Sequence, residues 1–189
     1  MDGITRDAVH AVNPASIVEL AAAGDSMAFA RLVAAYHPDL VRVAFVVAGG
    51  SQDIADDAVQ AAWTIAWRKL GTVRDPERIK PWLIAIAANE ARQLCRKGRR
   101  AAVAELHIDT PALQLADPVD ADPAARADAL DLEAAMASLS PDERTLLALR
   151  YEAGFDSGEI GRILGRPAAT IRWRLATLVA RLRKELRDA

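Results

Sequence analysis

The chain has 189 residues, an apolar content of 52%, a formal net charge of −2 and a single cysteine. This composition supports folded cores, argues against a disordered chain and excludes an intrachain disulfide. Sparse aromatic residues and abundant alanine favour helices over strands. The N-terminus lacks the basic flank of a signal peptide, and apolar runs such as 43–48 are far shorter than the roughly 20 residues that span a bilayer. We therefore expect a soluble, cytoplasmic protein without membrane insertion.

The charged residues are distributed unevenly. Five bases face one acid in residues 90–102, and seven bases face one acid in residues 166–187. Between them, in residues 103–133, eight acids face one base. Two basic patches separated by an acidic stretch are a pattern that any proposed function has to explain.

The first predicted elements are helical. Residues 1–15 show no clear period, and we expect a loose leader there. Asp25 is placed to cap a helix whose apolar residues recur at the helical period. We expect Pro38 to restart the chain and the apolar face to continue to the break at Gly49-Gly50.

Two further helices follow the break. Ser51 or Asp53 is predicted to cap a helix that stops near Gly71. After a polar loop, 72–80, Pro81 suits the first turn of a helix that is apolar at its start and basic at its end.

The stretch from about residue 100 to 127 contains three prolines among alanines and aspartates, without a sustained helical period, and we interpret it as a linker. The next domain is predicted to begin near Asp128. Within it, Ser140-Pro141-Asp142-Glu143 provides a cap, a proline at the first helical position and acids in the first turn.

The C-terminal part has the pattern of a helix-turn-helix. Asp156 and Glu159 form a start like a capping box for a short helix that ends at Gly165, and a longer helix is predicted to follow Pro167 and to run to about Leu186. At about 100° per residue, the apolar residues of the longer helix cluster on one side. These residues, which must be buried, are Ile171, Leu175, Leu178, Leu182 and Leu186.

The opposite side of this helix carries the candidate DNA contacts. Trp173 points away from the buried side, Ala169 and Thr170 also point outward, and Arg172 and Arg174 lie on the flanks. In helix-turn-helix proteins these positions contact base edges and phosphates in the major groove. Alternatively, Trp173 packs on a neighbouring helix and the arginines form a solvated face.

The motifs resemble those of the extracytoplasmic-function (ECF) sigma factors, RNA polymerase subunits with conserved regions 2 and 4 only. The resemblance covers about 160 of the 189 residues. Matching segments of region 4 are Leu139-Ser140-Pro141-Asp142-Glu143-Arg144, Leu149-Arg150-Tyr151, Gly154-Phe155, Glu159-Ile160, Leu164-Gly165, Pro167, Thr170-Ile171-Arg172, Arg174-Leu175 and Arg181-Leu182-Arg183. Matching segments of region 2 are Ala55-Asp56-Asp57-Ala58-Val59-Gln60, Trp63, Ala66-Trp67, 81–87 and Asn89-Glu90-Ala91-Arg92.

The resemblance implies an all-α protein with two small helical domains joined by a flexible acidic linker, the second domain containing the helix-turn-helix. We place the region 2-like domain at 16–100, the linker at 101–127 and the region 4-like domain at 128–189. The family linker threads through polymerase, which would give the acidic stretch a role beyond tethering.

The resemblance also implies partners and site residues. Core RNA polymerase would bind region 2 through its β′ clamp helices and region 4 through its β flap, and an anti-sigma factor would hold the protein inactive. The residues expected to bind the clamp helices are Asp56, Asp57, Gln60 and Trp63. Those expected to bind the separated −10 strand of promoter DNA are Arg78, Lys80, Asn89, Arg92, Arg96 and Lys97. Those expected to bind the −35 element are Ala169, Thr170, Arg172, Trp173 and Arg174.

Other interpretations of these residues remain open. Asn89 could be exposed or bonded locally, and Asp56 and Asp57 could serve only as favourable charges at a helix start. The three histidines have no ligand-like spacing, so we expect no metal, no cofactor and no catalysis.

Three other functions compete with a promoter-specificity subunit. A sigma-like decoy that sequesters an anti-sigma factor would not need the two basic clusters, and a simple helix-turn-helix repressor leaves the first domain unexplained. An all-α enzyme has the least support from the sequence.

Overall fold

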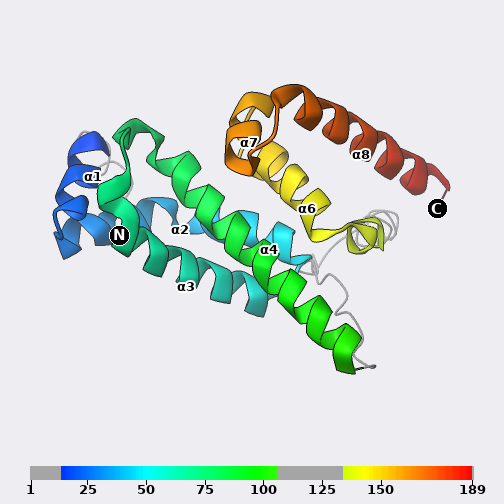
Figure 1. The fold of residues 1–189 in the computed structure, drawn as a ribbon, viewed down its shortest axis with the longest axis horizontal. Coiled ribbons are helices and arrows are strands. Elements are labelled where there is room, and N and C mark those ends of the chain that lie inside the picture. Colours follow the sequence, from blue (N-terminus) through cyan, green and yellow to red (C-terminus); the bar gives the residue numbers. More distant parts are fainter. Residues whose placement is uncertain (1–13, 106–133, 189) are drawn as a thin grey trace, which may run out of the picture.

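The computed structural model describes residues 14–105 and 134–188, and every regular element within these ranges is a helix. The predicted all-α class is therefore confirmed. Most of the predicted leader and linker lies outside the described residues. The helices form two groups, one before and one after the linker (Figure 1).

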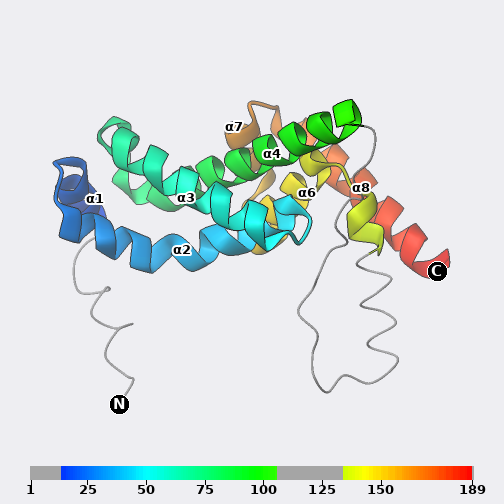
Figure 2. The same cartoon turned by 90° about the horizontal axis from the view of Figure 1, so that it is seen from below.

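The first domain contains four α-helices. They are α1 (Pro14–Ala22), α2 (Ser26–Ala48), α3 (Gln52–Lys69) and α4 (Ile79–Glu105), with the short 3₁₀ helices η1 (Leu70–Thr72) and η2 (Pro76–Arg78) between α3 and α4. Helix α4 lies across α2 and α3 (Figures 1 and 2). It continues to Glu105, five residues into the segment assigned to the linker.

Local signals determine where these helices begin and end. The Asp25 carboxylate accepts hydrogen bonds from the backbone N–H groups of Met27 and Ala28, at 2.8 and 3.0 Å, which confirms the predicted cap of α2. Helix α2 ends where Gly49 takes a left-handed conformation with φ of 73°. Ser51, rather than Asp53, then caps α3.

The structure differs from the sequence analysis at two points in this domain. Helix α1 was not predicted, although Ile17 and Val18 are buried against the rest of the domain. Pro38 does not restart the chain, because α2 continues through it. Leu32 before the proline and Leu40 after it are both buried in the same core, so tertiary packing outweighs the lost backbone hydrogen bond.

Small side chains let the helices of the first domain approach closely. Ala55, Ala58, Ala62 and Ala66 repeat along α3 at helical spacing, and all four are fully buried. The high alanine content of the chain thus has a packing role in this domain.

The second domain contains a helical segment at 134–138, then α6 (Pro141–Leu147), η3 (Ala148–Glu152), α7 (Ser157–Leu164) and α8 (Ala168–Asp188). The predicted cap at Ser140 and the predicted capping box at Asp156 are confirmed, and Ser140 also forms a capping box, with Glu143. Helices α7 and α8 form the predicted helix-turn-helix, with Gly165 in the left-handed conformation at the turn. A Cβ atom at Gly161 would lie 2.5 Å from the carbonyl oxygen of Arg166, so only glycine fits this close approach.

The two domains pack against each other in this structure. Helix α6 and η3 contact the end of α2, and α6 and α7 contact α4, while α8 lies on the side of α6 away from α4 (Figure 1). Leu146, Ala148 and Leu149 of the second domain belong to the same continuous apolar core as the helices of the first domain.

Candidate nucleic-acid interface

Helix α8 presents the predicted DNA-binding residues to solvent. Trp173 is 67% exposed, so most of its surface is open to solvent, although it borders a hollow that Asp142 and Leu146 of α6 also line. Ala169, Arg172 and Arg174 are exposed, and Thr170 is half-buried. Ile171, Leu175 and Leu178 are buried, as predicted, whereas Leu182 is half-buried and Leu186 is exposed. The helix therefore combines a packed side with an open basic and aromatic side.

The two arginines beside Trp173 keep their charge available. Neither Arg172 nor Arg174 forms an ion pair with another described residue. Arg181, further along α8, lies 2.8 Å from a carboxylate oxygen of Glu143 and 3.7 Å from one of Glu185. In the described part of the chain, no carboxylate thus neutralises Arg172 or Arg174, whereas Arg181 is paired.

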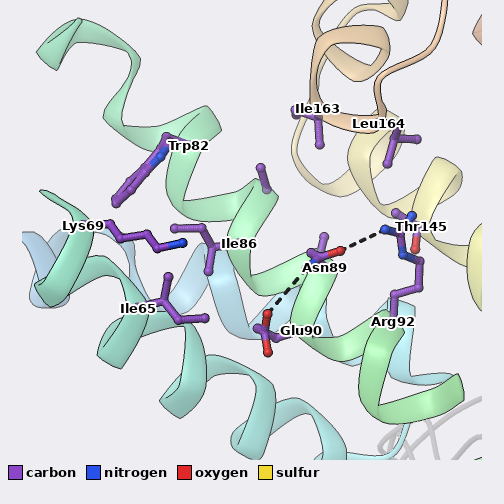
Figure 3. Close-up of a pocket in the computed structure, with 12 residues that line it drawn as sticks. Ile65, Lys69, Trp82, Ile86, Asn89, Glu90, Arg92, Thr145, Ile163 and Leu164 are labelled. Atoms are coloured by element: carbon purple, nitrogen blue, oxygen red, sulfur yellow. Dashed lines mark hydrogen bonds between the residues drawn. The ribbon is translucent and has the colours of Figure 1, made fainter. Parts of the chain in front are cut away.

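Helix α4 brings three of the predicted −10 residues together. The Oδ1 atom of Asn89 accepts a hydrogen bond at 2.8 Å from an Arg92 amino group, and Asn89 Nδ2 lies 3.5 Å from Glu90 (Figure 3). Arg96 follows one turn later on the same side, because both Arg92 and Arg96 approach Asp142 of the second domain. Lys97 is exposed on the neighbouring face. The predicted basic stripe exists, but Asp142 partly neutralises it.

The other two predicted −10 residues lie at the opposite end of α4. Lys80 Nζ is 2.7 Å from a carboxylate oxygen of Asp39, which also pairs with Arg42, and Arg78 Nε is 3.7 Å from Asp75. Sixteen residues separate Lys80 from Arg96, which is roughly 24 Å along a helix. The structure therefore divides the predicted −10 residues into two groups that an extended strand along α4 could contact in turn.

A hollow beside Asn89 reveals candidates that the sequence analysis missed. Lys69 from α3 and Trp82 from α4 line it together with Asn89, and Ile163 and Leu164 of α7 close one end (Figure 3). An aromatic ring and a lysine beside a polar amide suit the stacking and phosphate contacts that single-stranded DNA offers. The sequence showed only that a lysine and a tryptophan are present at these positions, because the hollow itself forms between separate helices.

The outer face of α3 carries the predicted polymerase contacts. Asp56, Asp57 and Gln60 are exposed, and Asp56 accepts a 2.7 Å hydrogen bond from the Gln52 side chain.

Trp63 differs from these three, because it is half-buried and ties α3 to α2. Its Nε1 atom donates a 3.2 Å hydrogen bond to Nδ1 of His37, and its ring packs edge-on against Phe29 with centroids 5.7 Å apart. Trp67, one turn later, is 45% exposed and also packs on Phe29, so it is a second aromatic candidate on this side.

Two family models match the chain over the regions that form these surfaces. The model of Sigma-70 region 2 matches residues 32–101, and that of Sigma-70, region 4 matches residues 135–184. The chain belongs to the sigma-70 family. Both models occur here in the order that the sequence motifs predicted.

Curated relatives agree with this assignment. The chain is 33% identical over 133 residues to the RNA polymerase sigma factor CarQ of Myxococcus xanthus, covering 70% of this chain and 75% of CarQ. It is 28% identical over 177 residues to the ECF RNA polymerase sigma factor SigM of Mycobacterium tuberculosis, covering 94% and 86%. It is 32% identical over 172 residues to the probable RNA polymerase sigma factor RfaY of Xanthomonas campestris. This match covers 88% of this chain but only 42% of RfaY. These matches assign the chain to the ECF sigma factors, with regions 2 and 4.

A solved structure supports the fold. The sigma factor RpoE, crystallised with the anti-sigma factor NepR from Bartonella quintana, superposes with a TM-score of 0.68 at 24% identity, covering 84% of this chain and 96% of RpoE. The function that this family gives the chain is promoter recognition as a sigma subunit of RNA polymerase.

Two negative findings complete the description of residues 14–105 and 134–188. These residues contain no cluster of three or more His, Cys, Asp or Glu side chains that could hold a metal ion. They also contain no helix of the length and apolar character that a bilayer crossing requires.

Proposed function

We propose that the ECF sigma factor contacts its promoter through two helices and the polymerase through a third. The first turns of α8 bind the −35 duplex, α4 binds the separated −10 strand, and the outer face of α3 binds the β′ clamp helices of core RNA polymerase. The observation that carries this assignment is the 67% exposed Trp173 between two arginines that have no described carboxylate partner.

The chemistry of α8 suits duplex DNA. A recognition helix contacts bases near its N-terminus, where Ala169, Thr170 and Arg172 are located. Arginine offers paired donors to guanine or phosphate, and an exposed tryptophan offers apolar contact to a base edge or sugar.

The chemistry of α4 suits an unpaired strand. Asn89 can donate to and accept from a base, and Arg92 and Arg96 provide the positive charge that backbone phosphates need. Lys97 extends this charge along the helix, and Arg78 and Lys80 provide it at the other end.

A groove between the second domain and the end of α2 is a candidate for the polymerase β flap. It is apolar and lies between α8 and η3, where Tyr151 is 63% exposed. The other apolar residues that line it are Val46, Met136, Leu147, Val179, Leu182 and Leu186. An amphipathic segment of a partner could bury these side chains.

The place of action and the inhibitor of the protein follow from its partners. RNA polymerase and promoters are cytoplasmic, so the protein acts there, as a binding subunit without a catalytic step of its own. An anti-sigma factor is the expected inhibitor. The two domains span residues 16–100 and 128–189, and the acidic segment between them joins the two DNA-binding surfaces.

Run-off transcription tests the proposal. Purified protein and core RNA polymerase are incubated with fragments of the source genome, and we expect promoter-specific transcripts only when both proteins are present. A test variant replaces Arg172 and Arg174 with Ala. It should lower the transcript yield without unfolding the domain, since both side chains are exposed. A protein that binds an anti-sigma factor but supports no transcript on any fragment would be the decoy.

A further inference from the structure

The connection between α3 and α4, residues 70–80, has few side chains that fix its position. It begins and ends on the buried residues Leu70 and Ile79, and between them it forms only the short turns η1 and η2. Most of the side chains between these two anchors are exposed. The connection carries Arg78 and Lys80, which are assigned to the −10 strand, so its position matters for DNA binding.

Asp39 of α2 joins this connection to the body of the domain. Its Oδ2 atom lies 2.7 Å from Nζ of Lys80, and its Oδ1 atom binds Arg42 on the next turn of α2. The Asp39 side chain is 22% exposed, against 43% for Lys80 and 56% for Arg42, so the carboxylate is the most enclosed of the three groups. Lys80 is thus paired with a carboxylate that Arg42 also holds in place.

Two neighbouring elements limit the movement of this pair. Tyr36, one turn before Asp39 on α2, is half-buried. Burial raises the pKa of its phenol and the charge of Lys80 opposes that shift, which places the ring near the pair. Helix α1 packs on η1 and η2 (Figures 1 and 2). The connection therefore rests on both α1 and α2, and the pairing of Lys80 with Asp39 is a polar contact with α2.

The pair contributes little to stability but orders a flexible side chain. An exposed ion pair adds little to the free energy of unfolding, because solvent screens the charges and two side chains have to be fixed. Lysine has a long stem with many rotamers, and a partner that selects one of them prepares the ammonium group for a ligand. The ammonium has three donors, so Lys80 can bind a phosphate while it stays paired with Asp39.

The position of Lys80 bears on the register of a bound strand. Lys80 lies nine residues before Asn89 in α4, which is roughly 14 Å along a helix. Contacts to phosphates set the register of a nucleic acid on a protein, and contacts to bases then read its sequence. A phosphate held at Lys80 therefore decides which base reaches Asn89.

We propose that Asp39 is a positioning residue for recognition of the −10 strand: its carboxylate fixes Lys80 on α2, and this sets the discrimination between bases. The inference rests on the proposed function, in which Lys80 and Asn89 contact that strand. Asp39 also places a negative charge near the phosphates, which weakens the binding of every sequence alike. Loss of the carboxylate should thus strengthen binding in general and reduce discrimination.

The first experiment measures binding of single strands by the complete chain assembled with core RNA polymerase. The probes are a fluorescent strand with the −10 sequence of a promoter that the protein transcribes and the same strand changed at one base. We expect Asp39→Asn to reduce the ratio of the two affinities about twofold to fivefold, the range of an exposed ion pair. It should also bind the changed strand more tightly than the parent protein does.

Asp53→Asn is the matched control for this experiment. It makes the same substitution at an exposed residue in the first turn of α3, at the opposite end of that helix from the connection, and it should keep the parental ratio. Equal strengthening of both strands in Asp39→Asn would show that the carboxylate acts only through its charge and would overturn the inference. A lower melting temperature with a parental ratio would show a merely structural role and would overturn it as well.

A double-mutant cycle tests whether Asp39 acts through Lys80. Lys80→Met keeps an unbranched stem of similar length and removes the charge. In a Lys80→Met background, Asp39→Asn should cause no further loss of discrimination, because the group that Asp39 positions is already gone. A further loss of the same size as in the parent would mean that Asp39 acts by another route, against the inference.

Lys80→Met also separates failure of this inference from failure of the proposed function. We expect this variant to bind all −10 strands more weakly, with a smaller salt dependence. Parental affinity and salt slope would show that the assignment of Lys80 to DNA is wrong, and the role of Asp39 falls with it. Weaker binding by Lys80→Met together with a parental ratio in Asp39→Asn would leave the proposed function intact and overturn only the positioning role.

Discussion

Glu143 and Ser140 bond to each other reciprocally at the start of α6. The Glu143 carboxylate accepts a 2.8 Å hydrogen bond from the backbone N–H of Ser140, and the Ser140 hydroxyl accepts one of 3.3 Å from the backbone N–H of Glu143. The same carboxylate pairs with Arg181 of α8 at 2.8 Å. One side chain thus caps α6 and ties it to the recognition helix.

This arrangement predicts an acid-dependent stability. Burial raises the pKa of Glu143, but the bonds from Ser140 and the charge of Arg181 outweigh it, so the net pKa is lowered. The stabilisation is therefore present above the ordinary carboxyl pKa and is lost as pH falls through the lowered value. Glu143→Gln should lower the free energy of unfolding at pH 7 and flatten its decline on acidification, as measured by urea unfolding at a series of pH values. Ser140→Ala should cost about 0.5–2 kcal/mol. A parental acid profile in Glu143→Gln would contradict the prediction.

The helix-turn-helix should not tolerate a side chain at Gly161. Gly161→Ala places a Cβ atom 2.5 Å from the carbonyl oxygen of Arg166, so the turn has to shift. We expect a loss of about 1–3 kcal/mol in thermal or urea unfolding, typical of overpacking. Gly98→Ala is the control, because a Cβ atom there would meet nothing within 4 Å and alanine favours a helix. Equal stability of Gly161→Ala and Gly98→Ala would mean that the turn adapts freely.

Substitutions on the outer face of α3 should distinguish residues that bind core RNA polymerase from residues that stabilise the fold. Asp57→Asn and Gln60→Ala change exposed side chains, so we expect weaker binding to core RNA polymerase with nearly unchanged stability. Trp63→Ala should instead cost about 2 kcal/mol of stability, less than a fully buried tryptophan would, because the ring joins α3 to Phe29 and His37. Polymerase pull-down and thermal melting of the same variants measure the two effects. Full polymerase binding by Asp57→Asn and Gln60→Ala would remove this face from the interface.

Promoter melting should depend on α4. We expect Asn89→Ala and Arg96→Ala to impair open-complex formation more than the first contact with duplex DNA, because these residues bind the separated strand. Permanganate footprinting of promoter thymines measures melting, and filter binding measures the duplex contact. Lys184→Ala is a control that removes an exposed positive charge far along α8. Normal footprints in both α4 variants would return Asn89 to its local bond with Arg92.

Recognition of the −35 element should depend on the first turns of α8. An arginine that contacts a base should cost about 1–3 kcal/mol on replacement by Ala and relax specificity at one position. A phosphate-binding arginine should mainly reduce the salt dependence of binding. Titration of labelled −35 duplex at several salt concentrations distinguishes the two cases for Arg172 and Arg174. Parental affinity and salt slope in both variants would show that this side of α8 is only solvated.

The sequence by itself determined the local features of this protein. The caps at Asp25, Ser140 and Asp156 were predicted correctly because a cap and its backbone partners lie within three residues of each other. The outward position of Trp173 followed from the helical period alone. The DNA-binding and polymerase-binding assignments came from motifs, and they remain predictions at the level of single residues.

Only the tertiary structure decided what depends on residues far apart in the chain. The continuity of α2 through Pro38 follows from a core that other helices complete. The hydrogen bond from Arg144 to Val47 joins residues 97 positions apart, and the pairing of Asp142 with Arg96 joins two domains. No periodicity or spacing encodes such a pair, because its energy arises only when separate helices bring the two groups within about 3 Å of each other.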